Sequence, residues 1–338
     1  MLGGKQVKIF IHIGLNKTGT SSIQQFMMNN QEELAAQGLA YPEYGRVHGG
    51  HHALANALQQ RPADVQKMVD AILEESAGAG AILISSEALH ACKNVNLLAD
   101  ATREADVRIV VYLRDFVDYV SSWYREDVQS SVVSGDFPRY AISKVGHLSK
   151  TLSAWIQSFG RKNVIIRAYD KRSLVNESSV DDFLSLLSLD PNADWKRLPY
   201  KNNVSISGNL LFFKRLVNLF EPDQARYSFR DELAALEALD PNFGGPMAIP
   251  RETVNYLYNM NTLDDEFLKD QLNFYLPRNP EARSGSPCPD LSTLKKDASL
   301  LLEQGSRSAP MFSDALQRYL PSSLLTSTHE AAPSIGDV

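Results

Sequence analysis

A glycine-rich turn between a buried strand and an amphipathic helix constrains this 338-residue chain more than any other feature. Val7–Ile13 (VKIFIHI) is rich in β-branched residues, which is typical of a buried strand. Ser21–Gln37 carries apolar residues at helical spacing, and Gly38 ends that pattern. Between them lies Gly14–Ser22 (GLNKTGTSS). A strand, turn and helix in this order direct backbone N–H groups and the positive end of the helix at one spot, so we predict an anion-binding site.

The residues of this turn suit an anion. Gly14 and Gly19 let the backbone wrap closely around an oxyanion, and Lys17 adds a full positive charge. The ATP-type P-loop places its lysine directly after the second glycine, whereas Lys17 precedes Gly19 by two positions. The alternative is a glycine turn whose hydroxyls only cap a helix. The other predicted contacts in the turn are Asn16, Thr18, Thr20 and Ser21.

Strand patterns alternate with helical patterns through the first 206 residues. The later strands are predicted at Ala81–Ser85, Val107–Leu113 and Val164–Ala168. Amphipathic helices are predicted between them at Ala63–Ser76, Val117–Gln129 and Leu148–Phe159. This alternation predicts an α/β fold of the P-loop type, with three layers around a central parallel sheet.

Strand patterns stop near residue 207. Helices are predicted at Leu210–Phe220, Arg251–Leu276 and Leu291–Gln304, and the composition of Pro277–Asp290 indicates a loop or linker. We therefore expect a core over residues 1–206 and a helical extension over 207–338, with a linker near 277–290 and a frayed tail from about Thr326. The extension is expected either to shape a substrate site or to form a contact between two copies of the chain.

The stretch Lys17-Thr18-Gly19-Thr20-Ser21 after a first strand resembles the 5′-phosphosulfate loop of sulfotransferases that use 3′-phosphoadenosine 5′-phosphosulfate (PAPS). In that family an arginine at a strand end and a serine eight positions later bind the 3′-phosphate, and Arg114 and Ser122 match that spacing. The proline common after the arginine is Phe116 here. Lys201–Ser205 is similar to the family's loop over the nucleotide, which adds Lys201 as a cofactor contact. The resemblance covers Val7 to Ser207 and favours the bacterial and carbohydrate-type branch.

The resemblance implies transfer of a sulfuryl group to an acceptor hydroxyl, on a glycan or glycolipid by family analogy, with adenosine 3′,5′-bisphosphate as the other product. Lys17 is the candidate that stabilises the leaving group, and no metal is required. Glu87 is the first candidate for the base, because it follows a predicted strand at the edge where α/β sheets place their sites. It could instead cap a helix. His51 and His52 are the other candidates for the base, since a neutral imidazole accepts protons near pH 7.

Two other classes remain open: a small-molecule kinase of the P-loop superfamily, with Asp115 as its magnesium ligand, and a non-catalytic module that binds a nucleotide or a glycan. The net charge of −6 argues against nucleic acid as a partner. Cys92 and Cys288 cannot form a disulfide framework, and no apolar run is long enough to span a membrane. We expect a cytoplasmic enzyme.

Overall fold

The chain forms two compact units in the computed structural model, which describes residues 6–197, 205–221, 229–278, 289–321 and 324. Unit 1 comprises Met1–Val120, Ile142–Lys201 and Tyr256–Asn279, and unit 2 comprises Ser121–Ala141, Asn202–Asn255 and Pro280–Val338. The sequence predicted a single boundary between residues 206 and 207. The division differs because Tyr256–Asn279 packs with the sheet: the Tyr258 hydroxyl donates a hydrogen bond to Asp115 Oδ2 at 2.8 Å.

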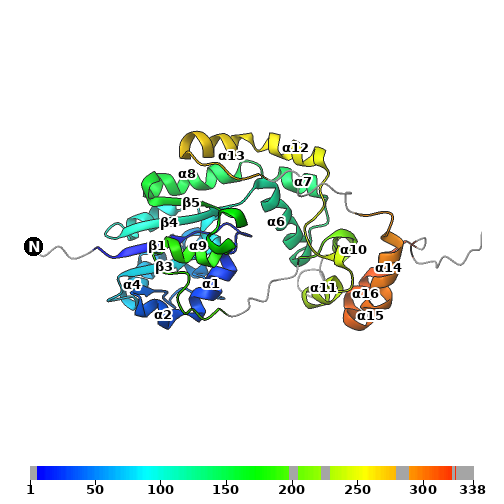
Figure 1. Cartoon of the computed structure of the whole chain (residues 1–338), viewed down its shortest axis with the longest axis horizontal. Coiled ribbons are helices and arrows are strands. Elements are labelled where there is room, and N and C mark those ends of the chain that lie inside the picture. The colour runs from blue at the N-terminus through cyan, green and yellow to red at the C-terminus, as the bar shows by residue number, and fades with distance from the viewer. Residues whose placement is uncertain (1–5, 198–204, 222–228, 279–288, 322–323, 325–338) are drawn as a thin grey trace, which may run out of the picture. The chain divides into compact units, whose positions relative to one another are not determined.

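Unit 1 is built on a parallel sheet in the order β2-β3-β1-β4-β5, so the predicted α/β fold with a central parallel sheet is confirmed (Figure 1). The bounds of β3 and β5 are those predicted, β1 is one residue shorter than predicted at each end, and β4 begins one residue earlier than predicted. Leu39–Ala40 adds a short edge strand that the sequence did not reveal. The strands are β1 Lys8–His12, β2 Leu39–Ala40, β3 Ala81–Ser85, β4 Asp106–Leu113 and β5 Val164–Ala168.

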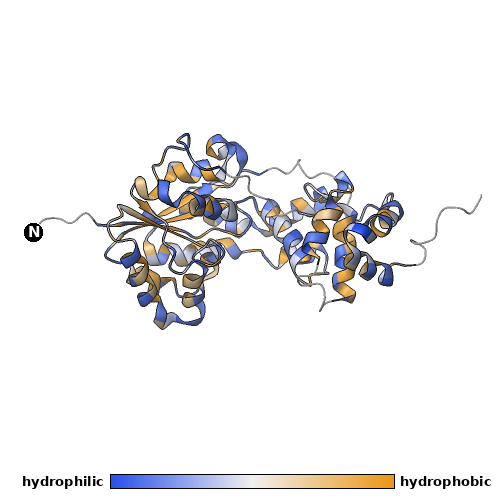
Figure 2. Cartoon of the chain, turned by 90° about the horizontal axis from the view of Figure 1, so that it is seen from below, coloured by the Kyte–Doolittle hydropathy of each residue, from blue (hydrophilic) through white to orange (hydrophobic). Residues whose placement is uncertain are grey.

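Helices cover both faces of the sheet, because successive side chains of buried strands point to opposite faces. On one face, Phe10 and Leu83 of the sheet pack with apolar side chains of α1, α2 and α9. The other face carries α8, which contacts β4 and β5. Figure 2 shows hydrophobic strands between two layers of amphipathic helices. The helices of unit 1 outside its last segment are α1 Thr20–Asn29, α2 Gln31–Ala36, α3 His52–Gln60, α4 Val65–Glu75, α5 Val95–Ala101, α8 His147–Phe159 and α9 Ser179–Leu186.

The prediction of one helix over Ser21–Gln37 is wrong, because the helix breaks at Asn30. Asn30 is fully buried, and its side chain bonds to a segment 166 residues away. Its Nδ2 donates to the Lys196 carbonyl at 3.2 Å, and its Oδ1 accepts from the Lys196 N–H at 2.8 Å. These two bonds give a polar side chain partners in the interior that a continuous surface helix would not need.

The predicted helix over Arg251–Leu276 is also interrupted, and it consists of α12 Arg251–Met260, α13 Thr262–Glu266 and a π-helical turn, Phe267–Gln271. Its second half is tied to α8, because the Asp264 carboxylate accepts the N–H groups of Leu148 at 3.3 Å and Ser149 at 2.9 Å. A carboxylate at this position satisfies N–H groups that the first turn of a helix leaves without acceptors.

Unit 2 is helical wherever the structure describes regular elements in it. Aromatic and aliphatic side chains of α10, α11 and α16 form its interior, and Phe229 and Phe312 meet edge to face with their ring centres 5.6 Å apart. None of the helices in the described ranges combines the length and the apolar character of a membrane-spanning segment. The helices of this unit, including α6, which starts in unit 1, are α6 Phe116–Ser130, α7 Phe137–Ile142, α10 Gly208–Phe220, α11 Arg230–Glu237, α14 Leu294–Glu303, α15 Gly305–Ser308 and α16 Pro310–Tyr319.

Candidate functional site

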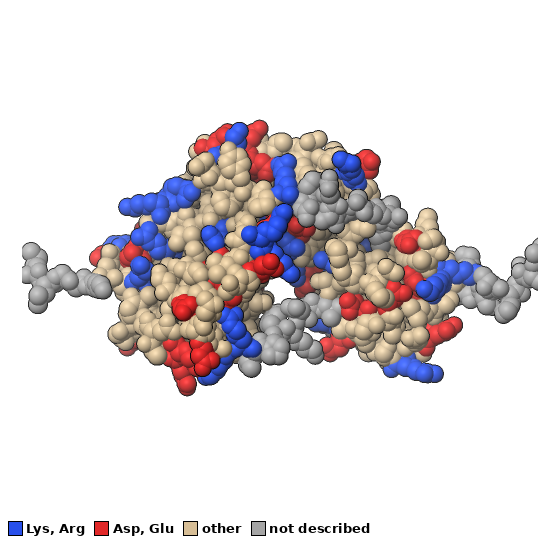
Figure 3. Space-filling model, viewed as in Figure 1, with Lys and Arg blue, Asp and Glu red and all other residues tan. Residues whose placement is uncertain are grey.

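The loops after β1 and β4 leave the same edge of the sheet and diverge. β1 lies between β3 and β4, and the chain turns to the β3 side after β1 but to the β5 side after β4. Ligands of open α/β sheets bind at such a point, outside the carboxyl ends of the strands. Gly14–Ser22, hereafter the anion loop, follows β1, and Arg114 follows β4. A group of Lys and Arg side chains lies over this part of unit 1 in Figure 3.

The backbone of the anion loop takes left-handed conformations that residues other than glycine rarely adopt. The φ angles of Gly14, Lys17 and Gly19 are +69°, +63° and +80°. A Cβ atom on Gly14 would lie 2.7 Å from the Cα of Glu87, and one on Gly19 would lie 2.7 Å from the Oγ of Ser179. Glycine is therefore required at both positions. The left-handed backbone of Lys17 is the kind of local strain that clusters at ligand sites.

The first turn of α1 offers N–H groups to a ligand. Gly19 is the N-cap and provides no side-chain acceptor, and the first N–H groups of a helix have no acceptor within it. The Thr18 hydroxyl is fully buried and donates to the Leu15 carbonyl at 2.7 Å, so it holds the loop together. Thr20 is buried and Ser21 is exposed. The site is thus made mainly of backbone donors.

Arg114 meets the anion loop directly. Its Nη1 donates to the Lys17 carbonyl at 3.0 Å, and its guanidinium lies over the Tyr169 ring, 5.6 Å from the ring centre. Burial lowers the pKa of Arg114 from its ordinary value, but a guanidinium stays charged at neutral pH. The structure therefore brings together the two predicted anion contacts, Lys17 and Arg114, although 97 positions separate them.

Ser122 and Asp115 lie on either side of the α6 N-terminus. Ser122 is buried on α6 and belongs to unit 2. Asp115 Oδ1 accepts the Asp118 N–H at 3.0 Å, as a helix cap does, while its Oδ2 accepts the Tyr258 hydroxyl. Both carboxylate oxygens of Asp115 already serve the fold, which weakens Asp115 as a magnesium ligand for a kinase.

Glu87 lies beside the anion loop, as its approach to Gly14 shows. It is the first residue of a 3₁₀ turn, Glu87–Ala91, whose N-cap is Ser86. The cap is the Ser86 hydroxyl, which accepts the Ala88 N–H at 3.3 Å, so the Glu87 carboxylate is not the cap. Glu87 Oε2 accepts from Gln24 Nε2 at 2.8 Å, and about a quarter of its side chain is exposed. The carboxylate therefore reaches the surface next to the anion loop.

The two candidate histidines differ in their surroundings. His51 is fully buried, with Nε2 3.1 Å from the Pro42 carbonyl and Nδ1 accepting the Ser85 N–H at 3.2 Å. Burial lowers its pKa to about 4. Both ring nitrogens of His51 are therefore occupied within the fold. His52 is partly exposed and its Nε2 lies 3.9 Å from Glu87 Oε1, so it is the histidine that the structure places beside the candidate base.

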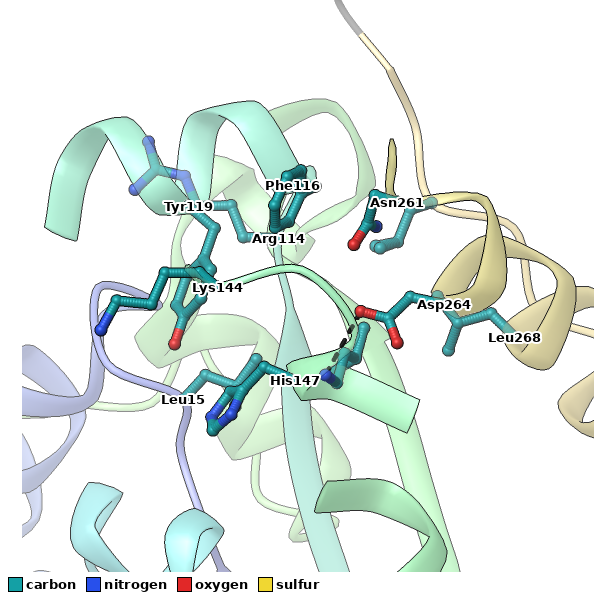
Figure 4. Close-up of a pocket in the computed structure, with 11 residues that line it drawn as sticks. Leu15, Arg114, Phe116, Tyr119, Lys144, His147, Asn261, Asp264 and Leu268 are labelled. Carbon is teal, nitrogen blue, oxygen red and sulfur yellow. Dashed lines mark hydrogen bonds between the residues drawn. The ribbon is translucent and has the colours of Figure 1, made fainter. Parts of the chain in front are cut away.

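A pocket adjoins Arg114 on the side of α8 and α13 (Figure 4). Arg114 and Lys144 supply positive charge, and Phe116 and Leu268 supply apolar walls. Asn261, 3% exposed, lines the pocket, and its Oδ1 has no hydrogen-bond partner within the described ranges. The pocket combines cations, apolar surface and an amide oxygen open to a donor next to the anion loop.

Some residues at the site were not predicted from the sequence, and one predicted residue is not described by the structure. Gln24 and Tyr169 were not singled out, although Gln24 follows Thr20 by four positions and hence lies on the same face of α1. Lys201 lies outside the described residues. In the part of the chain that the structure describes, no group of three or more His, Cys, Asp or Glu side chains could hold a metal ion.

No family model matches this chain, and no curated protein matches its sequence. Among solved structures, it is similar to a sulfotransferase from Alicyclobacillus acidocaldarius, with a TM-score of 0.37 and 17% sequence identity. The match covers 68% of this chain and 94% of that chain. The TM-score and the identity are too low for this likeness to bear on the function.

Proposed function

We propose that the chain is a sulfotransferase that uses PAPS and an acceptor hydroxyl, by family analogy a sugar hydroxyl of a glycan or glycolipid. The observation that carries the proposal is the contact between Arg114 and the Lys17 carbonyl, which unites both predicted anion contacts at the point where the loops after β1 and β4 diverge. A donor with two separate phosphate groups needs two such cationic contacts within one site.

The residues present fit the donor. Gly14 and Gly19 leave the backbone free to approach an oxyanion, and the uncapped N-terminus of α1 adds donors. PAPS supplies the sulfuryl group when it is bound. Lys17 and the N–H groups of α1 would bind the 5′-phosphosulfate and stabilise the charge that develops on the leaving oxygen. Arg114 would bind the 3′-phosphate, and Ser122 stays a prediction from the sequence spacing.

Glu87 would take the proton of the acceptor hydroxyl. Its Cα and Cβ lie beside Gly14 and its side chain is partly exposed, so its carboxylate can reach a group placed at the anion loop. A base within hydrogen-bond distance of the reacting hydroxyl contributes about 10²- to 10⁴-fold to such a reaction. Sulfuryl transfer in line, with a positioned base and no metal ion, is the chemistry that these groups support best.

Calorimetric titration with adenosine 3′,5′-bisphosphate tests this function, with ATP and 5′-AMP as control ligands. We expect tight binding that depends on the 3′-phosphate and weakens about 10- to 100-fold in Arg114→Ala, since a charged hydrogen bond contributes about 1.5–3 kcal/mol. Arg108→Ala is the matched control, because Arg108 lies on β4, the strand that Arg114 follows, but bonds to Asn163 Oδ1 at 3.2 Å.

Other outcomes of the titration and of a sulfate-transfer assay would contradict the proposed function. Equal binding of ATP would favour the kinase, and no binding of any of the three nucleotides would refute the proposal. Nucleotide binding without sulfate transfer to any acceptor, water included, would favour the non-catalytic module.

A further inference from the structure

The carboxylate of Glu87 is held from one side by Gln24. This residue lies on α1, just past the anion loop, and is 4% exposed. Its Nε2 donates to Glu87 Oε2 at 2.8 Å and to Ser85 Oγ at 3.3 Å, which uses both N–H groups of the amide. A single buried side chain therefore joins α1 to the end of β3 and to Glu87 just beyond it.

No hydrogen bond to the other carboxylate oxygen of Glu87 is found among the described residues. Its Oε1 lies 3.9 Å from His52 Nε2, which is beyond hydrogen-bond distance. The His52 ring is fixed on its far side, because Nδ1 lies 2.7 Å from Ser86 Oγ. The contact with Gln24 thus determines which carboxylate oxygen of Glu87 is left to take a proton.

The backbone at Gly50 closes over this cluster. A Cβ atom there would lie 2.8 Å from His52 Nε2 and 2.9 Å from Gln24 Nε2. A larger residue at position 50 would displace one of the two side chains. The absence of a side chain at Gly50 therefore leaves room for Gln24 and His52 beside Glu87.

We propose that Gln24 is a positioning residue that holds Glu87 Oε2, so that Oε1 faces the acceptor. The proposal rests on the proposed function. The proton of the acceptor hydroxyl passes to Glu87 Oε1, and the acceptor oxygen bonds to sulfur. The bond from sulfur to the phosphate oxygen breaks, and its electron pair stays on that oxygen. Gln24 touches none of the reacting atoms and acts only through Glu87.

The first test follows sulfate release from PAPS, with water as the acceptor. We expect Gln24→Met to lower kcat about tenfold, the effect of losing one hydrogen bond to a charged group, and to leave the binding of adenosine 3′,5′-bisphosphate unchanged. Gln25→Met is the matched control on the same helix, because Gln25 bonds only to Asn29 Oδ1, at 2.8 Å, among the described contacts. Gln24→Asn, one methylene shorter, should lose as much as Gln24→Met and replaces it if that variant does not fold.

A double-mutant cycle separates positioning from a structural role. In the Glu87→Gln background, Gln24→Met should cause no further loss of kcat, because its effect passes through the carboxylate. Losses that multiply would overturn the proposal, as would an unchanged rate in both Gln24→Met and Gln24→Asn. A wild-type protein that neither binds adenosine 3′,5′-bisphosphate nor releases sulfate would refute the proposed function instead.

The contact itself can be followed without turnover. In the ligand-free protein, the side-chain amide resonances of Gln24 in a ¹⁵N–¹H spectrum should move in Glu87→Gln and stay in place in Gln25→Met. Gln24 amide resonances that do not move in Glu87→Gln would overturn the proposal, and this result does not depend on a measurement of activity.

Discussion

Lys214 on α10 gives unit 2 an expected pH dependence of stability. Its side chain is fully buried, its Nζ donates to Asn218 Oδ1, and it lies 5.6 Å from the centre of the Phe229 ring. Burial lowers the pKa of Lys214 from 10.5 to about 8. Such a shift corresponds to about 3 kcal/mol of free energy that opposes folding when the side chain is charged in both states.

The sign follows from proton binding. Between pH 8 and 10.5 the unfolded chain holds a proton on Lys214 that the native chain has released, so the free energy of unfolding rises with pH across that range. Lys214→Met removes this dependence. The stability of the wild type relative to Lys214→Met should therefore rise by about 2 kcal/mol between pH 7 and pH 9.5.

Urea unfolding of both proteins at the two pH values, followed by circular dichroism, measures this difference. Comparing the difference between the proteins, rather than either alone, cancels the contributions of groups that titrate equally in both. A difference that stays constant from pH 7 to pH 9.5 would show that the native state does not hold Lys214 away from water.

Three further predictions concern the site. Lys17→Ala should lower kcat at least 100-fold, while the free energy of unfolding, measured by thermal denaturation, changes by less than about 1 kcal/mol. A loss of activity that is explained by a loss of stability would exclude Lys17 as a ligand of the donor. Glu87→Gln should keep the affinity for adenosine 3′,5′-bisphosphate in calorimetry but lower transfer at least 100-fold; an unchanged rate would transfer the role of the base to His52. Gly19→Ala should abolish nucleotide binding in the same assay, because an alanine at φ +80° would place its Cβ 2.7 Å from Ser179 Oγ; retained affinity would show that the loop tolerates a side chain.

The inner strands of the sheet could be predicted from the sequence because they are largely buried. Such strands are continuous apolar runs, as in Ala81–Ser85, whereas the half-buried edge strand Val164–Ala168 was predicted from its β-branched residues. The break at Asn30 could not be predicted, since its cause is a hydrogen bond to Lys196, far along the chain. The return of residues 256–279 to unit 1 depends on contacts of the same long-range kind.

Part of the site could be predicted from the positions of the strands. Lys17 and Arg114 follow strands, and the edge of a parallel sheet gathers such residues whatever their separation in sequence. Gln24 gives no such signal, because a glutamine on an amphipathic helix usually faces water. Its partner Glu87 becomes apparent only when α1 and β3 are packed together. The burial that sets His51 apart from the adjacent His52 is likewise a property of the fold alone.

The chain passes from unit 1 to unit 2 three times, and this imposes an order on folding during synthesis. Domains tend to fold as units while the chain emerges from the ribosome, N-terminal parts first. Here the tyrosine that binds Asp115 and the aspartate that caps α8 lie at positions 258 and 264, after the first helices of unit 2. The contacts of the sheet are therefore completed only after these two side chains have been synthesised, when roughly half of unit 2 has already left the ribosome. A chain truncated at residue 206 would lack both side chains, and its free energy of unfolding should be lower than that of unit 1 in the full chain.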